Sequence, residues 1–200
     1  FIMRELWIFK DVFPDQGPVI HQWDEPEERE FDGKKVMGRP TRGFGDATFK
    51  YAGKTYEPTP WEQAPDVLDL KVKSEKLLKE KMGKEIEFSF CLCGLYSDGE
   101  TAIPHHSDTV PTLEDVVVGV SFGAPRILEW TKYEYQIKKH PNTSEVDLLY
   151  GDNFLKTTPH LLEDGDVYVF DGYSQMYSTH AIPTMKKVGA RVNFTFRSGV

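Results

Sequence analysis

A strictly alternating run near the end of the 200-residue chain constrains its fold most. Apolar Val192, Phe194 and Phe196 alternate there with polar Arg191, Asn193, Thr195 and Arg197. In a β-strand, successive side chains point to opposite faces, so the apolar set would face a core and the polar set would share the other surface. Two guanidinium groups on one face repel each other unless they bind an anion, and the planar fork of arginine suits carboxylates. The run therefore predicts a strand that holds a small dianion.

A second motif, His106-Ser107-Asp108, lies upstream of this strand and is followed by His180. Two histidines and one carboxylate form the facial triad that binds non-haem Fe(II) and leaves positions open for co-substrate and oxygen. An isolated His-x-Asp arises by chance in many chains. Here His180 follows His106 by 74 residues and precedes Arg191 by 11 residues. The combination predicts His106, Asp108 and His180 as metal ligands.

The chain contains four other histidines that could compete for the metal, His21, His105, His140 and His160. His105 is the nearest rival, but Ser107 stands two residues after it where a carboxylate would be needed. His140 and His160 each have a proline beside them, which is typical of surface loops. His180, close to the arginine strand, is therefore preferred as the third ligand.

These motifs resemble those of the AlkB family of 2-oxoglutarate- and Fe(II)-dependent dioxygenases. That family has His-x-Asp, a distal His and then Arg-x-Asn-x-Thr-Phe-Arg, and the last motif is present at 191–197 without a mismatch. The resemblance extends from about Gly38 to Arg197. It implies Fe(II), 2-oxoglutarate and O2 as cofactors and oxidative demethylation of N-alkylated bases in DNA or RNA, with succinate, CO2 and an aldehyde as products.

The same resemblance implies roles for residues around the metal. Arg191 would pair with the distal carboxylate of 2-oxoglutarate, Arg197 would approach the carboxylate nearest the iron, and Asn193 would help to order the pocket. Tyr96 would hydrogen-bond the co-substrate, in a segment where the family commonly has Asn-x-Tyr-x-x-Gly. Gly94 replaces the asparagine of that pattern, which removes one side-chain hydrogen bond.

A stretch before the predicted helix resembles the substrate-recognition lid of the family. Its candidate substrate contacts are Arg39, Arg42, Phe44 and Tyr51. The aromatic rings could stack on a base turned out of its helix, or they could be ordinary core residues, while the arginines would contact phosphates. Arg126 lies in a further family-like segment and could face the substrate cavity. Members acting on alkylated bases often have an acid just after His-x-Asp, and Thr109-Val110-Pro111 stands there instead, so the preferred base is not predicted.

Hydrophobic periodicity predicts one helix, from Pro65 to Met82, whose lysines form a solvated face. Strands are predicted at 87–96, 115–122 and 167–170, a hairpin at 127–135 with 146–155, and a loop at 14–33. This pattern fits a mainly β (α+β) fold with flanking helices, built on a double-stranded β-helix or jelly-roll core with an N-terminal substrate-recognition lid. We expect a single domain over 1–200, divided into an extension and lid (1–60), a supporting helix (61–84) and the jelly-roll core (85–200).

Composition bears on partners and location. The net charge of -8 argues against a nucleic-acid partner, because phosphate binding usually draws on a basic excess, although Gly33–Lys54 contains six basic residues and one acid and could form a local basic surface. Cys91 and Cys93 are predicted to be buried thiols in a reducing compartment. No apolar run approaches membrane-spanning length and no signal pattern is visible at the start. We expect a monomeric, intracellular protein of the cytoplasm or nucleus, with no membrane association, whose partner is nucleic acid carrying alkylated bases.

Two other classes of function remain open. A 2-oxoglutarate-dependent hydroxylase of a protein side chain or a small molecule would suit the acidic charge and the missing acid after His-x-Asp. A catalytically silent binding module could keep the fold alone. Such a module would not need all three metal ligands and both arginines, which the chain has.

Overall fold

A computed structural model describes residues 5–31, 33–51, 54–108, 114–134 and 154–198. The larger of its two main sheets contains β1 (Trp7–Phe9), β12 (Asp166–Asp171), β9 (Val116–Gly123), β14 (Arg191–Arg197), β7 (Phe90–Tyr96) and β4 (Thr41–Gly45), in that order. The smaller contains β11 (Phe154–Leu162), β10 (Arg126–Tyr133), β13 (Ser178–Ile182) and β8 (Ile103–His106). The pairings in both sheets are antiparallel, which confirms the predicted mainly β jelly-roll fold.

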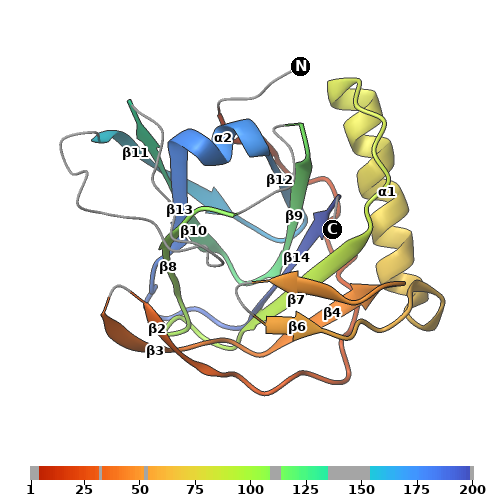
Figure 1. Cartoon of the computed structure of the whole chain (residues 1–200), viewed down its shortest axis with the longest axis horizontal. Coiled ribbons are helices and arrows are strands. Elements are labelled where there is room, and N and C mark those ends of the chain that lie inside the picture. The colour runs from red at the N-terminus through yellow and green to blue at the C-terminus, as the bar shows by residue number, and fades with distance from the viewer. Residues whose placement is uncertain (1–4, 32, 52–53, 109–113, 135–153, 199–200) are drawn as a thin grey trace.

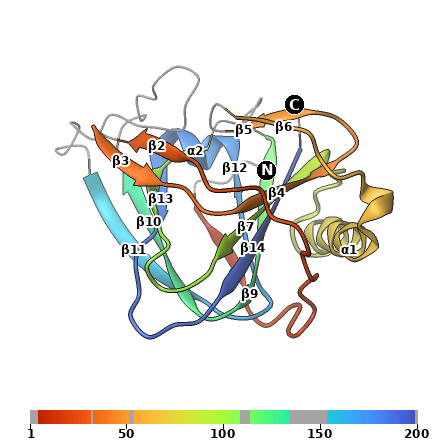
Figure 2. The same cartoon turned by 90° about the horizontal axis from the view of Figure 1, so that it is seen from below.

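Helices and hairpins lie outside the two sheets. The long helix α1 (Pro65–Met82), preceded by the short turn η1 (Trp61–Gln63), lies on the side away from β10 and β11 (Figures 1 and 2). The shorter α2 (Gly172–Tyr177) joins β12 of the larger sheet to β13 of the smaller. Two hairpins come from the N-terminal part of the chain, β2 (Glu28–Phe31) with β3 (Lys34–Met37), and β5 (Phe49–Tyr51) with β6 (Lys54–Tyr56). Neither described helix has the length and apolarity required to cross a membrane.

The alternating strand predicted at 191–197 is β14, and it lies inside the larger sheet between β7 and β9. Phe194 and Phe196 are fully buried in the core that packs under α1, and Val192 packs against the same cluster. Arg191 and Arg197 are also buried, although they are charged. Both faces of β14 are therefore covered, one by the core and the other by the interior between the sheets.

Helix α1 forms where the apolar spacing predicts it. Its buried face includes Val67, Leu70, Leu77 and Leu78, and burial of each such side chain contributes about 1.5–3 kcal/mol. Gly83 ends the helix in the left-handed conformation, with φ of 64°. Lys71 departs from the predicted solvated face, because it is buried and lies 2.9 Å from Glu75.

Cys91 and Cys93 are free, buried thiols on the core face of β7, which confirms that they form no disulfide. Burial raises the pKa of both groups. Buried thiols with raised pKa values are poor nucleophiles, so neither is a candidate for catalysis.

The second strand of the predicted hairpin falls mostly outside the described residues. The described partner of β10 is β11 at 154–162, which includes the last two residues of the strand predicted at 146–155, and residues 146–153 lie outside the described part of the chain. Pro159 disfavours a strand prediction because it has no N–H to donate, but β11 is at the edge of its sheet, where proline is tolerated. His160 consequently lies in a strand rather than a surface loop.

The N-terminal part of the chain contains a strand where a loop was predicted. The segment predicted as a loop at 14–33 contains β2, which pairs with β3 across a turn that includes Gly33, with φ of 72°. An Asp-Gly pair between two short strands favours a two-residue hairpin and could have indicated this. The larger sheet also takes β1 and β4 from the segment 1–60, so the strands of the jelly roll are not confined to 85–200.

Candidate functional site

The register between two strands brings together histidines that are far apart in the sequence. His106 is the last residue of β8 and lies directly opposite His180 of β13. Their ring centroids are 4.2 Å apart. Asp108 follows two residues beyond the end of β8, and candidate ligand atoms of all three residues lie within 4.8 Å of one another. This is the group predicted from the sequence, and all three side chains are buried.

The electrostatics of the group suit a divalent cation. Asp108 carboxylate oxygens lie 3.7 Å from Nε2 of His106 and 3.6 Å from Nε2 of His180. Nδ1 of His106 lies 2.9 Å from the carbonyl of Pro104, which can only accept, so Nδ1 carries the proton and Nε2 keeps its lone pair. Burial lowers the pKa of His106, and burial followed by the charge of His106 lowers that of His180 to about 3. Two neutral imidazoles and one carboxylate therefore converge on one point.

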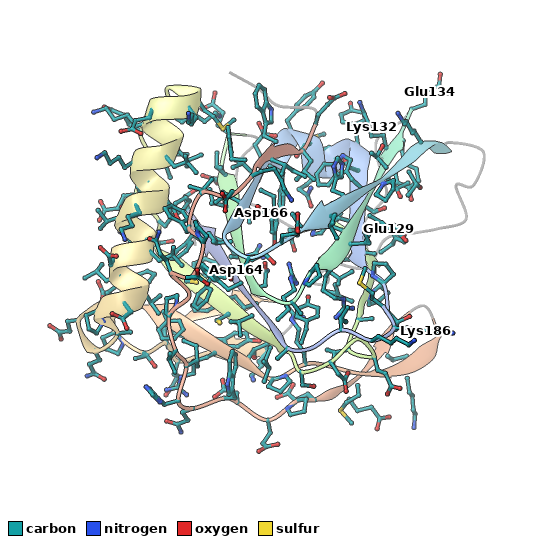
Figure 3. All side chains as sticks on the ribbon, turned by 180° about the vertical axis from the view of Figure 1, so that it is seen from behind. Glu129, Lys132, Glu134, Asp164, Asp166 and Lys186 are labelled. Atoms are coloured by element: carbon teal, nitrogen blue, oxygen red, sulfur yellow. The ribbon has the colours of Figure 1, made fainter. Side chains whose placement is uncertain are left out.

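The rival ligand His105 points away from this group. Its Nε2 lies 3.1 Å from Glu129 on β10, and its Nδ1 lies 3.4 Å from the Thr179 hydroxyl. Figure 3 shows Glu129 on the side of the molecule away from α1. Within the described ranges, His106, Asp108 and His180 form the one cluster with metal-binding geometry. His140 lies outside the described residues.

Helix α2, which the sequence did not predict, holds the His-x-Asp loop in place. The Ser107 hydroxyl donates to the carbonyl of Gln175 at 2.5 Å, and the backbone N–H of Asp108 donates to Oε1 of Gln175 at 2.8 Å. Asp171 and Ser174 close a capping box at the start of the helix. Gln175 is fully buried. Its position therefore fixes the carboxylate ligand.

Replacement of Gln175 with leucine should lower affinity for divalent metal by about tenfold, because partners behind a metal ligand commonly contribute 10–100-fold. Titration of the purified protein with Co(II) or Mn(II) would measure this. Gln63→Leu, a change to an exposed side chain in η1, is the matched control. A folded Gln175→Leu protein with parental metal affinity would mean that Gln175 does not position Asp108.

Arg191 forms a buried cationic site at the start of β14, over the ring of Tyr96, which lines the metal pocket. It is 1% exposed, and its Nε donates to the Ser121 hydroxyl at 2.8 Å while Nη2 donates to Oδ1 of Asn193 at 3.1 Å. Among the described residues, Nη1 has no hydrogen-bond partner and no carboxylate forms an ion pair with Arg191. A buried cation without a counter-ion is costly. The site therefore suits an anionic ligand, as the alternating strand predicted.

The other predicted co-substrate residues surround the same space. Asn193 exchanges hydrogen bonds with the Tyr168 hydroxyl at 2.9 and 3.1 Å. The guanidinium of Arg191 lies 4.8 Å from the centroid of the Tyr96 ring. Nη1 of Arg197 lies 3.6 Å from Asp108, at the metal end of the strand. The two arginines thus lie at opposite ends of β14, with Arg197 near the metal group and Arg191 away from it, as binding of a dicarboxylate would require.

A pocket between the two sheets contains the metal group. Its cavity volume is about 30 Å³, and the pocket is partly open to solvent. Its walls include Leu128, Tyr168 and Phe170, and Trp130 stacks on His180 with ring centroids 5.8 Å apart. These apolar walls strengthen the electrostatic interactions inside the pocket by excluding water.

The structure does not bring all predicted substrate residues to this pocket. Arg126 is fully buried, and its guanidinium donates to the backbone carbonyls of Asp98, Thr101 and Pro183, so it stabilises loops and does not line the pocket. Arg42 lies 3.2 Å from Asp24 and also donates to Thr59. Arg39 does line the pocket.

Phe44 lies in the hydrophobic core and is only 4% exposed, which contradicts its expected role in base stacking. The side chain of Tyr51, the other expected stacking residue, lies outside the described part of the structure. The alternation of strand β4 explains the position of Phe44, because its Cβ points to the core face.

A Phe44→Leu variant should therefore lose about 1–2 kcal/mol of folding stability, the usual cost of an imperfect core replacement. Its affinity for substrate should stay at the parental value. Thermal or urea unfolding would measure the first quantity, and substrate titration the second. If the ring stacked on a base, the leucine variant would instead weaken binding by about 1–3 kcal/mol with little loss of stability.

Comparisons with known proteins agree with this geometry. The family model described as "2OG-Fe(II) oxygenase superfamily" matches residues 6–197. Alpha-ketoglutarate-dependent dioxygenase alkB homolog 3 from Bos taurus and from Homo sapiens are each 29% identical over 164 residues, covering 80% of this chain and 51% of theirs. The chain thus spans about half the length of these relatives. A solved structure titled "The structure of OsALKBH1" aligns over 99% of this chain and 100% of its own, with a TM-score of 0.59 and 19% identity.

Proposed function

We propose that this chain, which belongs to the 2OG-Fe(II) oxygenase superfamily and is AlkB-like, removes alkyl groups oxidatively from nucleic acid bases. As a member of the superfamily it uses Fe(II), 2-oxoglutarate and O2. The complete Arg-x-Asn-x-Thr-Phe-Arg motif on β14, beside a buried facial triad, is the observation that carries the proposal. The identity of the substrate, an alkylated nucleic acid base, is the part of this function that we propose.

The residues present fit the metal and its co-substrate. His106, Asp108 and His180 offer two lone pairs and one carboxylate at a single point, and the unused nitrogen of Arg191 suits a carboxylate. When bound, iron with 2-oxoglutarate and O2 supplies oxidation of an unactivated C–H bond, with succinate and CO2 as co-products. An N-alkyl group hydroxylated in this way leaves as an aldehyde and frees the base.

The protein contributes orientation and the exclusion of water. Arg191 would fix the distal carboxylate of 2-oxoglutarate and Arg197 would orient Asp108, from 3.6 Å away. The proton on Nδ1 of His106 is held by the Pro104 carbonyl, so the lone pair stays aimed at the metal position. The apolar walls would keep the reacting carbon in a dry site, where positioning can lower the barrier by several kcal/mol.

The test uses DNA and RNA oligonucleotides that carry single N-methylated bases. Loss of the methyl mass from the oligonucleotide, with stoichiometric succinate, is the expected result, and Asp108→Ala is the inactive control. Binding should weaken steeply as salt is raised if phosphates contribute. Unchanged oligonucleotide masses over DNA and RNA strands, single and double, would contradict the proposal.

A second candidate is hydroxylation of a protein side chain or a small molecule. The pairing of cations near the N-terminal hairpins favours it, because Lys35 lies 3.6 Å from Glu28, and Arg42 and Lys54 lie 3.2 and 3.8 Å from Asp24. Paired cations attract phosphates less. Succinate production stimulated by a peptide or metabolite extract, but not by oligonucleotides, would support this function instead.

A further inference from the structure

Two loops join the strands of the metal ligands to the strands that carry the proposed co-substrate residues. Residues 97–102 lead from Tyr96, the last residue of β7, to β8 and its ligand His106. Residues 183–190 lead from β13, with its ligand His180, to the start of β14. Each loop crosses from one main sheet to the other. The position of the loops therefore affects the spacing between the metal ligands and the co-substrate residues.

The guanidinium of Arg126, the first residue of β10, binds both loops. Its Nη1 donates to the carbonyl of Asp98 at 3.2 Å, and its Nη2 donates to the carbonyls of Thr101 and Pro183, both at 2.7 Å. The single nitrogen Nη2 thus bridges the first loop and the second. Arg126 is fully buried, and hydrogen bonds that are shielded from water are stronger than those at a surface.

The loops also contact each other directly. The N–H of Met185 donates to the carbonyl of Gly99 at 2.9 Å. A Cβ at residue 99 would overlap the carbonyl oxygen of Met185, so this close approach of two backbones requires glycine. At the far end of the second loop, the N–H of Ala124 donates to the carbonyl of Ala190 at 2.9 Å. The second loop is thus held at one end by Arg126 and at the other by the residue two positions before Arg126.

Arg126 also lies against one of the co-substrate residues. The centroid of the Tyr96 ring is 5.3 Å from the guanidinium carbon of Arg126 and 4.8 Å from that of Arg191. Both distances are within the range of a cation–π interaction. Arg126 does not line the metal pocket, so it would act on the co-substrate through Tyr96 and through the two loops.

We infer that Arg126 is a positioning residue that sets the length of the co-substrate site, and that it thereby selects a five-carbon 2-oxo dicarboxylate over one that is longer by a methylene group. This goes beyond the proposed function, because it concerns the co-substrate and depends on membership of the superfamily, not on the nucleic acid base.

The length of the site matters because 2-oxoglutarate would be bound at both ends. Its keto-acid end would be held at the metal ligands and its distal carboxylate by Arg191. If the loops fix the spacing between these two positions, 2-oxoadipate, whose carboxylates are one methylene farther apart, fits poorly. A difference of one methylene group commonly changes discrimination by about 10- to 200-fold in a site that fits closely.

Arg126→Lys tests this inference and keeps the positive charge. The ammonium of lysine ends one bond short of Nη2, so it cannot hold Thr101 and Pro183 where they lie in the parent. Anaerobic isothermal titration of the metal-loaded protein, without nucleic acid, measures its affinities for 2-oxoglutarate and 2-oxoadipate. The parent should bind 2-oxoglutarate at least about tenfold more tightly. In Arg126→Lys this ratio should fall about tenfold, because a misplacement of about 1 Å can cost as much as about 100-fold.

Gly99→Ala is an independent perturbation, because a Cβ there pushes the two loops apart while Arg126 stays intact. It should lower the same ratio, and it decides the question alone if Arg126→Lys does not fold. Gly189→Ala is its matched control, since a Cβ at residue 189 of the second loop would meet no atom within 4 Å. Arg42→Lys, on β4 and outside both loops, is the control for the arginine change. Both controls should keep the parental ratio.

Thermal unfolding and affinity for Co(II) are measured on each variant. Metal affinity should stay at the parental value, because the metal ligands are unchanged. The inference would be overturned by a parent that binds the two acids equally, or by a folded Arg126→Lys protein with the parental ratio. Equal losses of affinity for both acids and for the metal would also overturn it, since Arg126 would then be a general structural residue. None of these results bears on demethylation of a base, which the titration does not involve.

Discussion

Replacement of Asp108 with alanine is expected to abolish turnover. Its carboxylate is the anionic member of the triad, is 2% exposed, and lies between the two histidine Nε2 atoms at 3.7 and 3.6 Å. Alanine would leave Fe(II) with two neutral imidazoles, and the positive charge of Arg197 would face the metal with no carboxylate between them. Turnover should fall by more than about 100-fold, since loss of a group behind a ligand already costs 10–100-fold.

Succinate formation and metal content, measured on the same preparation, check this prediction. Circular dichroism and thermal unfolding establish that the variant is folded. Asp69→Ala, which removes an exposed carboxylate on α1, should keep parental activity and metal content. A folded Asp108→Ala protein with normal turnover would remove the facial triad from consideration.

The parts of the site that could be predicted are those with a local signature. The alternation at 191–197 depends only on the two-residue period of a strand, and β14 has the predicted bounds. His106 and Asp108 stand in one short motif. His180 could be chosen by its spacing to Arg191, but its position opposite His106 depends on pairing between β8 and β13, which no local pattern specifies.

The misassigned residues are those whose role depends on distant partners. Arg126 donates to carbonyls of residues 98, 101 and 183, and these come together only in the folded chain. The local sequence around Phe44 is compatible both with a ring that packs in a core and with one that stacks on a base. In the structure the side chain is only 4% exposed, so it packs in the core. Residue type alone could not separate these roles.

Gln175 was missed because α2 is a single short element whose sequence lacks an extended apolar period. The Asp171-x-x-Ser174 pattern was its one visible signal, since a side-chain cap is typical of a helix start. The hydrogen bond from Asp108 to Gln175 spans 67 residues of sequence. Such a contact becomes visible only when both strands that flank α2 are placed.

Conversion of Arg191 to lysine should weaken binding of 2-oxoglutarate by about 1–3 kcal/mol, or roughly 5- to 150-fold, the scale of a charged hydrogen bond. Lysine keeps the positive charge but cannot donate to Ser121, to Asn193 and to a carboxylate from one planar group. Isothermal titration of the metal-loaded protein with 2-oxoglutarate under anaerobic conditions measures the affinity.

The metal site provides an internal control for this prediction, because Arg191 donates hydrogen bonds to Ser121 and Asn193 and not to the metal ligands. Metal affinity of Arg191→Lys should therefore match the parent while co-substrate affinity drops. Arg42→Lys is the control variant, because it makes the same substitution at a guanidinium that donates to Asp24 and Thr59. It should leave affinity for 2-oxoglutarate unchanged. Equal 2-oxoglutarate affinity in the parent and Arg191→Lys would mean that the buried guanidinium is structural, and that the distal carboxylate binds elsewhere in the pocket.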